Sequence, residues 1–144
     1  MKLKFKTTDG KRVYKIPDDI CNKMIKNANK ALKNTYPEAN EGFAVALLTA
    51  KGNMYEGVSY ISDTYTLTMH SEAVALAHAA LHGEKDIVAI TGPNCHICKQ
   101  LIWESSIKSG IDTVVIVEKE SGEFEKVPIS KMMSYPWPDE KGNK

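Results

Sequence analysis

The chain has 144 residues, 42% of them hydrophobic, which is enough for one buried core and too few for two ordinary domains. Its 19 basic and 18 acidic residues leave a formal net charge of +1, so it lacks the global positive field that would attract nucleic acid or an acidic membrane surface. We therefore expect one domain over residues 1–144, with neither nucleic acid nor a membrane as its partner.

The sequence also indicates a compartment. The first six residues alternate charged and apolar side chains and lack the apolar run of a signal peptide, and no later stretch is long enough to span a bilayer. Three cysteines are an odd number, which suits a reducing environment better than a secreted disulfide framework. These features predict a cytoplasmic protein.

The first predicted elements are a hairpin and a helix. Residues 3–6 and 12–16 alternate around Thr8–Gly10, which predicts a hairpin extension over residues 1–16, with a flexible basic arm as the alternative. From Pro17, apolar residues recur at helical spacing behind a proline and two acids, and this pattern predicts a helix to about Asn34.

The middle of the chain predicts a second hairpin and a second helix. Residues 43–50 and 54–60 are extended segments joined by a turn at 51–53. Residues 71–81 are rich in Ala and Leu and are followed by Gly83, which is typical of a helix with a glycine cap.

The remaining elements alternate between strands and helices. In chain order they are a buried strand at 87–90, a helix at 95–109 ending at Gly110, a buried strand at 114–117, an extended segment at 124–127 and a helical turn at 129–133. This order predicts an α/β fold in which a mixed sheet of about five strands lies between helix layers, a three-layer α/β/α architecture.

A metal site is predicted where two of these helices begin. His70 precedes the second helix, and Cys95 and Cys98 begin the third. One imidazole and two thiolates fill three corners of a zinc tetrahedron, and an open fourth corner distinguishes a catalytic site from a structural one. The positive ends of both helices also stabilise thiolates. We therefore expect His70, Cys95 and Cys98 to bind Zn²⁺.

Glu72 supplies the expected catalytic group. It lies two residues after His70, within reach of a zinc-bound water without being a ligand itself. Zinc lowers the pKa of that water toward about 7, and a carboxylate can accept its proton, protonate a ring nitrogen and later deliver a proton to a leaving amine. The expected reaction is hydrolytic deamination by a zinc-bound hydroxide, with Glu72 as proton shuttle.

Other interpretations of these residues are open. A CxxC pair occurs in redox proteins, but there it is expected near the start of a thioredoxin-like fold. A structural zinc site needs a fourth ligand, and Cys21 falls within the apolar stripe of the first helix. A further alternative is a non-catalytic module that zinc stabilises. Glu72 argues against it, because a purely structural metal needs no proton shuttle. The remaining histidines are interpreted as structural or surface residues; they are His78, His82 and His96.

With these residues in place, the chain resembles the zinc-dependent cytidine deaminase superfamily, whose signature is H-x-E…P-C-x-x-C. The similarity spans residues 17–139 and is closest to small nucleoside cytidine deaminases and blasticidin S deaminase. It is carried by Ala46–Gly52, Tyr65–Glu72, Cys95–Glu104 and the tail Pro128–Asp139. The resemblance implies a deaminase of cytidine, deoxycytidine or a related nucleoside that releases ammonia. It also implies a homo-oligomer, a tetramer in preference to a dimer, whose tail reaches toward a neighbouring site.

The zinc motifs depart from the family pattern in two ways. His70 stands where many nucleoside deaminases have Cys, and Ala73 stands where they have Arg. These changes agree physically, because three thiolates leave a negative centre that an Arg offsets, whereas one His and two Cys do not. Asn94 also separates Pro93 from Cys95, which alters the loop before the second motif.

The substrate contacts also depart from the family. Ser59 and Ile61 occupy the positions of the Asn and Glu that bind the ribose, and losing a charged hydrogen bond to a sugar hydroxyl costs about 2–3 kcal/mol, or about a hundredfold in affinity. The alternative substrates are therefore a nucleoside antibiotic such as blasticidin S, a nucleotide or a free base. Phe43 either lines the pocket or packs in the core.

Two further residues are expected beside the substrate. Tyr65 is expected to contact the base, and the backbone N–H groups near Ser71 and Cys95 are expected to orient the attacking hydroxide.

Overall fold

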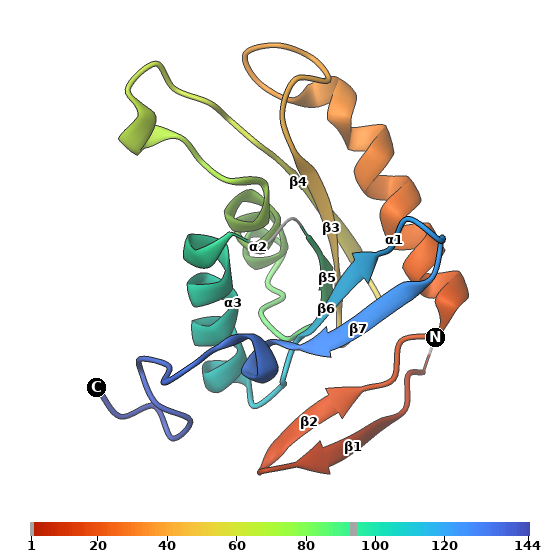
Figure 1. The fold of residues 1–144 in the computed structure, drawn as a ribbon, viewed down its shortest axis with the longest axis vertical. Coiled ribbons are helices and arrows are strands. Elements are labelled where there is room, and N and C mark those ends of the chain that lie inside the picture. The colour runs from red at the N-terminus through yellow and green to blue at the C-terminus, as the bar shows by residue number, and fades with distance from the viewer. Residues whose placement is uncertain (1, 93–94) are drawn as a thin grey trace.

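The computed structural model describes residues 2–92 and 95–144 (Figure 1). Near its N-terminus, β1 (Phe5–Thr8) and β2 (Lys11–Tyr14) pair antiparallel, with Phe5 opposite Tyr14. The turn between them places Asp9 and Gly10 at φ values of 52° and 78°, a conformation that Asp-Gly tolerates in tight hairpins. The predicted N-terminal hairpin is confirmed.

A five-stranded mixed sheet forms the centre of the molecule, in the order β4-β3-β5-β6-β7. Its strands are β3 (Ala44–Thr49), β4 (Met54–Val58), β5 (Ile87–Thr91), β6 (Val114–Glu118) and β7 (Phe124–Pro128). The β5–β6 pair is parallel, and the other pairs are antiparallel. The parallel strands are connected by a crossover that contains a helix, as is usual for parallel pairs.

Three helices cover the two faces of this sheet (Figure 1). They are α1 (Asp18–Ala31), α2 (Ser71–Leu81) and α3 (His96–Ser109). Alternating residues of β3 show which helices cover which face: Ala46 and Leu48 belong to the core that includes α1, whereas Val45 and Leu47 belong to the core that includes α2 and α3. The predicted three-layer α/β/α fold is confirmed.

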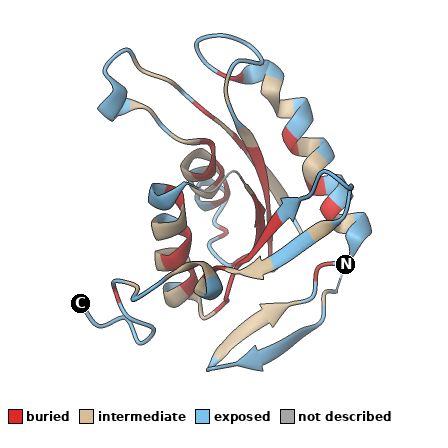
Figure 2. Cartoon of the chain, in the orientation of Figure 1, coloured by how far each residue is buried: buried red, intermediate tan, exposed pale blue. Residues whose placement is uncertain are grey.

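Burial is greatest where these layers meet (Figure 2). All five residues of β5 are buried, as expected for a central strand covered on both faces. Trp103 of α3 and Met24 of α1 are fully buried on opposite sides of the sheet. In the part of the chain that the structure describes, no helix combines the length and apolar character needed to cross a membrane.

The helix ends follow the sequence pattern closely. Gly83 and Gly110 follow α2 and α3 with φ values of 79° and 74°, which only glycine adopts at little cost. The first helix predicted to reach Asn34 ends at Ala31, and a 3-10 turn continues through Leu32–Asn34. The predicted turn near the C-terminus is also a 3-10 turn, at Ile129–Met132.

Candidate metal centre

The predicted ligands stand at the entrances of α2 and α3. His70 is the residue before α2 and Cys95 is the residue before α3, and both have extended backbone angles. Neither side chain caps its own helix with a hydrogen bond, so both are available for contacts between the two helix ends. Cys98 lies in the first turn of α3. The altered loop expected at Pro93 and Asn94 lies outside the residues that the structure describes.

The three ligand atoms form a compact triangle. The Cys95 sulfur lies 3.3 Å from Nδ1 of His70 and 3.4 Å from the Cys98 sulfur, and the Cys98 sulfur lies 3.4 Å from the same Nδ1. Zinc bonds of about 2.0–2.3 Å in a tetrahedron separate neighbouring ligand atoms by about 3.5–3.8 Å. The triangle agrees with that spacing to within a few tenths of an ångström. Its size and its one-nitrogen, two-sulfur donor set therefore fit a zinc ion.

The environment of Cys98 disfavours a thiolate that has no cation beside it. This thiol is buried, and burial raises its pKa, with the Cys95 thiol and the negative charge of Glu72 acting in the same direction. A metal ion reverses this preference because it coordinates the thiolate and offsets its charge. Cys95 is exposed and His70 half-buried, so the triangle opens to the surface on one side.

Glu72 lies within the protein beside this triangle. Its side chain is only 2% exposed, and the hydroxyl of buried Ser71 donates a hydrogen bond of 2.7 Å to its Oε1 atom. Glu72 is also within hydrogen-bonding reach of the Cys98 thiol. A solvated surface glutamate, the ordinary role of this residue type, is therefore excluded here. The arrangement places a buried carboxylate next to the candidate metal ligands.

Gly57 of β4 allows the first turn of α2 to approach the sheet. A Cβ atom at this position would lie 2.1 Å from the carbonyl oxygen of Ser71 and 2.3 Å from the backbone nitrogen of Ala75. Both neighbours are backbone atoms, so they cannot move aside cheaply. Glycine at position 57 thus allows the turn that carries Glu72 to lie directly against β4.

The residues expected to contact substrate differ in how far they are exposed. Phe43 is 60% exposed, so its alternative role as a core residue is wrong. Ser59 is 4% exposed, and its Oγ accepts a hydrogen bond of 3.0 Å from the Phe43 backbone N–H. Its hydroxyl oxygen thus already takes part in holding the ends of β3 and β4 together.

Ile61 and Tyr65 belong to the segment 59–69, which leads from β4 to α2. The half-buried Ile61 donates its backbone N–H to the Tyr36 carbonyl at 3.0 Å. Tyr65 is 84% exposed in the 3-10 turn Tyr65–Leu67, at the tip of a segment that projects from the body (Figure 1). Its expected contact with the substrate stays a prediction.

One feature beside the site was missed by sequence reasoning. The rings of Tyr36 and Tyr60 stack with centroids 3.9 Å apart and planes 6° from parallel. Tyr60 also exchanges backbone hydrogen bonds with Met69, the residue before His70. The stack thus supports the segment that delivers His70. Tyr36 lies outside any helix or strand, and no periodic pattern could have identified it as a partner of Tyr60.

The C-terminal tail packs on α3 of its own chain. Trp103 donates its indole N–H to the Pro138 carbonyl at 2.7 Å, and Gln100 donates to the Trp137 carbonyl at 2.5 Å.

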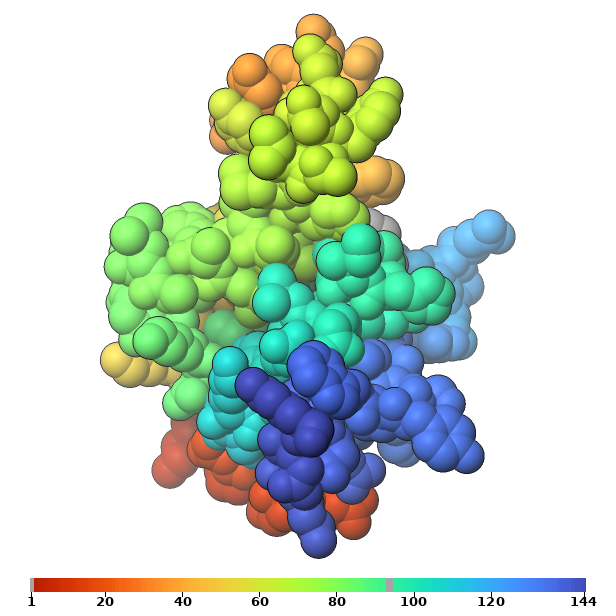
Figure 3. All heavy atoms as spheres, turned by 90° about the vertical axis from the view of Figure 1, so that its left-hand side faces the viewer, coloured from red at the N-terminus to blue at the C-terminus, as the bar shows by residue number. Residues whose placement is uncertain are grey.

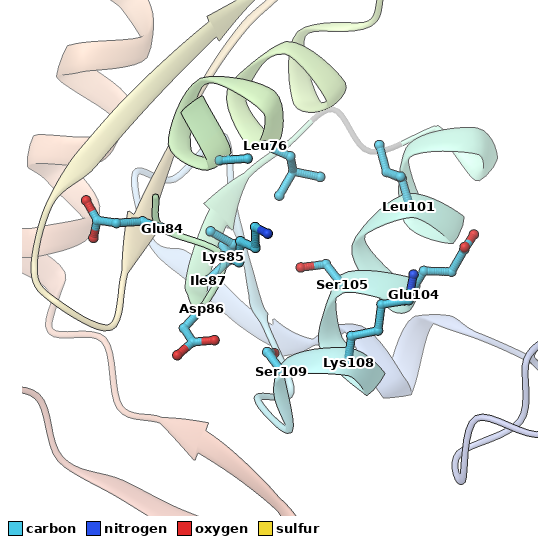
Figure 4. A pocket seen from close by; sticks show the side chains of 11 residues that line it. Leu76, Glu84, Lys85, Asp86, Ile87, Leu101, Glu104, Ser105, Lys108 and Ser109 are labelled. Atoms are coloured by element: carbon cyan, nitrogen blue, oxygen red, sulfur yellow. The ribbon is translucent and has the colours of Figure 1, made fainter. Parts of the chain in front are cut away.

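A cavity of about 480 Å³ lies between α2 and α3, with Leu76 and Leu101 among the side chains that line it (Figure 4). Its lining includes none of the predicted site residues, and the candidate zinc ligands and Glu72 lie at the opposite ends of these helices.

Comparison with solved structures identifies the fold. A cytidine deaminase from Burkholderia pseudomallei matches with a TM-score of 0.67 at 21% identity, over 81% of this chain and 98% of that one. The cytidine deaminase from Mycobacterium leprae gives 0.63 at 20% identity, over 78% and 96%. The one from Bacillus anthracis gives 0.60 at 13% identity, over 82% and 89%. The chain thus has the cytidine deaminase fold.

Comparison at the level of sequence families agrees with the fold. A search among curated proteins gave no match. Residues 19–118 match the family described as the cytidine and deoxycytidylate deaminase zinc-binding region. That range contains the candidate zinc ligands His70, Cys95 and Cys98, as well as Glu72. The chain therefore belongs to the cytidine and deoxycytidylate deaminase zinc-binding family.

Proposed function

We propose that this protein is a zinc-dependent aminohydrolase that deaminates cytidine, deoxycytidine or a related nucleoside and releases ammonia. The observation that carries the proposal is the position of Glu72, which is 2% exposed, hydrogen-bonded to Ser71 and adjacent to Cys98. A purely structural metal site needs no such carboxylate, and its burial costs free energy that a catalytic role explains.

The chain's own residues supply the binding and proton-transfer steps. His70, Cys95 and Cys98 would hold the zinc ion, which when bound acidifies water and so provides a nucleophile at neutral pH. Glu72 accepts a proton from the attacking water and passes it to the ring nitrogen next to the reacting carbon. It then transfers the second proton of that water to the amino group, and the carbon–nitrogen bond breaks to release ammonia.

Ser71 acts on Glu72 rather than on the substrate. Its hydroxyl fixes one oxygen of the carboxylate at 2.7 Å, and this restricts the direction of the other oxygen. The first backbone N–H groups of α2 and α3 have no partner within their helices, and in this proposal those near Ser71 and Cys95 orient the attacking hydroxide.

The identity of the sugar or its replacement is the open part of the proposal. Ser59 is buried and its oxygen is hydrogen-bonded to Phe43, and the aliphatic side chain of Ile61 cannot bind a hydroxyl. This observation favours a second candidate within the same reaction class. In that case the substrate is a nucleoside antibiotic such as blasticidin S, a nucleotide or a free base.

A screen for ammonia release tests both candidates. Zinc-loaded protein is assayed with cytidine, deoxycytidine, cytosine, guanine and blasticidin S. Efficient turnover of cytidine supports the first candidate and contradicts the second.

A variant tests the role of Glu72. Glu72→Ala should lower kcat by about 10²–10⁴ while leaving zinc content unchanged, and Glu123→Ala, at an exposed glutamate, serves as its control. Full turnover in the Glu72 variant contradicts the proposed mechanism.

We also propose that the protein is a cytoplasmic homo-oligomer, a tetramer in preference to a dimer, that acts as one domain. One face of the molecule is formed by the segment 59–69, α2, α3 and the tail (Figure 3). These segments carry exposed apolar side chains, with Leu67 68% exposed, Leu81 82% and Ile97 71%, and we propose that contact between subunits covers them. The three cysteines are all unpaired, in agreement with a reducing compartment. Light scattering after size-exclusion chromatography measures the subunit count, and a monomer at micromolar concentration contradicts this part.

A further inference from the structure

Two histidines far along α2 take no part in the proposed reaction. His78 lies in the last turn of α2, and His82, four residues later, is the residue that follows the helix. Their ring centroids are 5.3 Å apart. His78 is half-buried and His82 is exposed, so both are accessible from solvent.

A backbone hydrogen bond determines which nitrogen of His78 carries the proton. Nδ1 of His78 lies 2.9 Å from the carbonyl oxygen of Glu56. A carbonyl oxygen can only accept, so Nδ1 must be the donor. In the neutral ring, Nε2 therefore has a free lone pair. A ring N–H bound to a backbone carbonyl is also the arrangement that orients histidine ligands in metal sites.

Tyr55 of β4 holds both imidazole rings. Its ring centroid lies 5.1 Å from that of His78, in an edge-on contact, and 5.1 Å from that of His82, in a stacked contact. The Tyr55 hydroxyl is bound by the buried carboxylate of Glu84. Glu84 in turn accepts hydrogen bonds from Thr49 at 2.5 Å and Asn53 at 2.8 Å. The two histidines thus rest on a tyrosine that is anchored at both its ring and its hydroxyl.

The spacing of the rings suits a shared metal ion. Two imidazoles bound to one metal through bonds of about 2.0–2.1 Å, in neighbouring positions, have centroids about 5 Å apart. The ring centroids of His78 and His82 lie 5.3 Å apart, close to that separation. Histidines at positions i and i+4 of a helix are a known way of binding a metal, and His78 and His82 have this separation, with His82 directly after the last helical residue.

We propose that His78 and His82 form a second metal site, which binds one divalent transition-metal ion through two imidazole nitrogens, with water at the open positions. Imidazole favours Ni²⁺, Cu²⁺ and Zn²⁺, and Cu²⁺ binds most tightly of these. The site begins eight residues after His70 on the same helix, which places it about 12–18 Å along the helix axis from the first metal centre. The two sites therefore share no ligand.

Ni²⁺ binding to untagged protein tests the proposal, because Cu²⁺ would oxidise the cysteines. Protein first loaded with one equivalent of zinc is titrated with Ni²⁺ by calorimetry, and the bound metals are counted by mass spectrometry. We expect one additional Ni²⁺ per chain. His78→Gln and His82→Gln should each weaken its binding at least about tenfold, whereas His96→Gln, the change at the remaining histidine, should leave it intact.

Two further variants separate this site from the first. Tyr55→Leu removes the supporting ring and should weaken Ni²⁺ binding about tenfold, as loss of an outer partner does in other metal sites. Cys98→Ser removes a ligand of the first site and should leave Ni²⁺ binding at the histidine pair unchanged, so the two proposals fail independently. Circular dichroism confirms folding of each variant. No additional Ni²⁺ in the wild type, or Ni²⁺ binding as tight as that of the wild type in either histidine variant, overturns the proposal.

Discussion

The hydroxyl of Ser71 donates a 2.7 Å hydrogen bond to Oε1 of Glu72, and both side chains are buried in the first turn of α2. The two residues are adjacent in sequence, yet the bond matters only because that turn lies against the ligands at the start of α3. A flexible carboxylate would have to be ordered again in each catalytic cycle, whereas a fixed one is already in place. Ser71 is therefore a positioning residue for Glu72.

Ser71→Ala should lower kcat without loss of zinc. A hydrogen bond to a charged group is worth about 1.5–3 kcal/mol, which corresponds to about 10–100-fold in rate when it orients the reacting group. Steady-state kinetics combined with metal analysis measures both quantities. Ser121→Ala, at an exposed serine, is the control. A Ser71 variant with unchanged kcat would show that Glu72 is oriented by other contacts.

Cys98→Ser should abolish zinc binding, whereas Cys21→Ser should retain it. Cys98 belongs to the ligand triangle, and Cys21 is a buried residue of α1 that packs in the opposite core. The Cys21 variant therefore controls for the general effect of replacing a buried thiol. Zinc content is measured after dialysis against a weak chelator, with both changes made in the His78→Gln background so that the histidine pair holds no zinc. Retention of a full equivalent of zinc by the Cys98 variant would remove this cysteine from the site.

Glu84 should contribute to stability in a pH-dependent way. Hydrogen bonds from Thr49 and Tyr55 lower the pKa of this carboxyl below its ordinary value of 4.5. The folded state thus holds its proton less tightly than the unfolded state, so this stabilisation is present above about pH 4.5 and is lost as the pH falls through the lower folded value. Urea unfolding at a series of pH values should show a smaller acid loss for Glu84→Gln than for wild type. Equal slopes would contradict the assignment.

Gly57→Ala should destabilise the protein and reduce activity together. The new Cβ would lie 2.1 Å from the Ser71 carbonyl oxygen and force the first turn of α2 away from β4. Overpacking of this kind costs about 1–3 kcal/mol, or more when backbone must move. Gly10→Ala is the contrasting variant, because its Cβ meets nothing within 4 Å, although φ is +78°. Thermal unfolding and kcat together reveal the difference, and a fully active Gly57 variant would show that α2 tolerates the shift.

The architecture and the chemical groups could be predicted from local pattern. The apolar run at 87–90 indicated a strand buried on both faces, and the helix limits were marked by Pro17, Gly83 and Gly110. Phe43 shows the limit of this reasoning. A pocket role and a core role were both compatible with its position at a strand end, and only the 60% exposure of its side chain excluded the core.

By itself, the sequence determined which elements form and which residues could bind zinc, because helix periodicity, strand burial and ligand type are properties of short segments. Only the tertiary structure decided that the Ser59 oxygen is held by Phe43 and that Tyr36 stacks on Tyr60. It alone also placed His78 and His82 on the ring of Tyr55. Each of these contacts depends on distances between segments that are separate in the chain and are brought together by packing on one sheet.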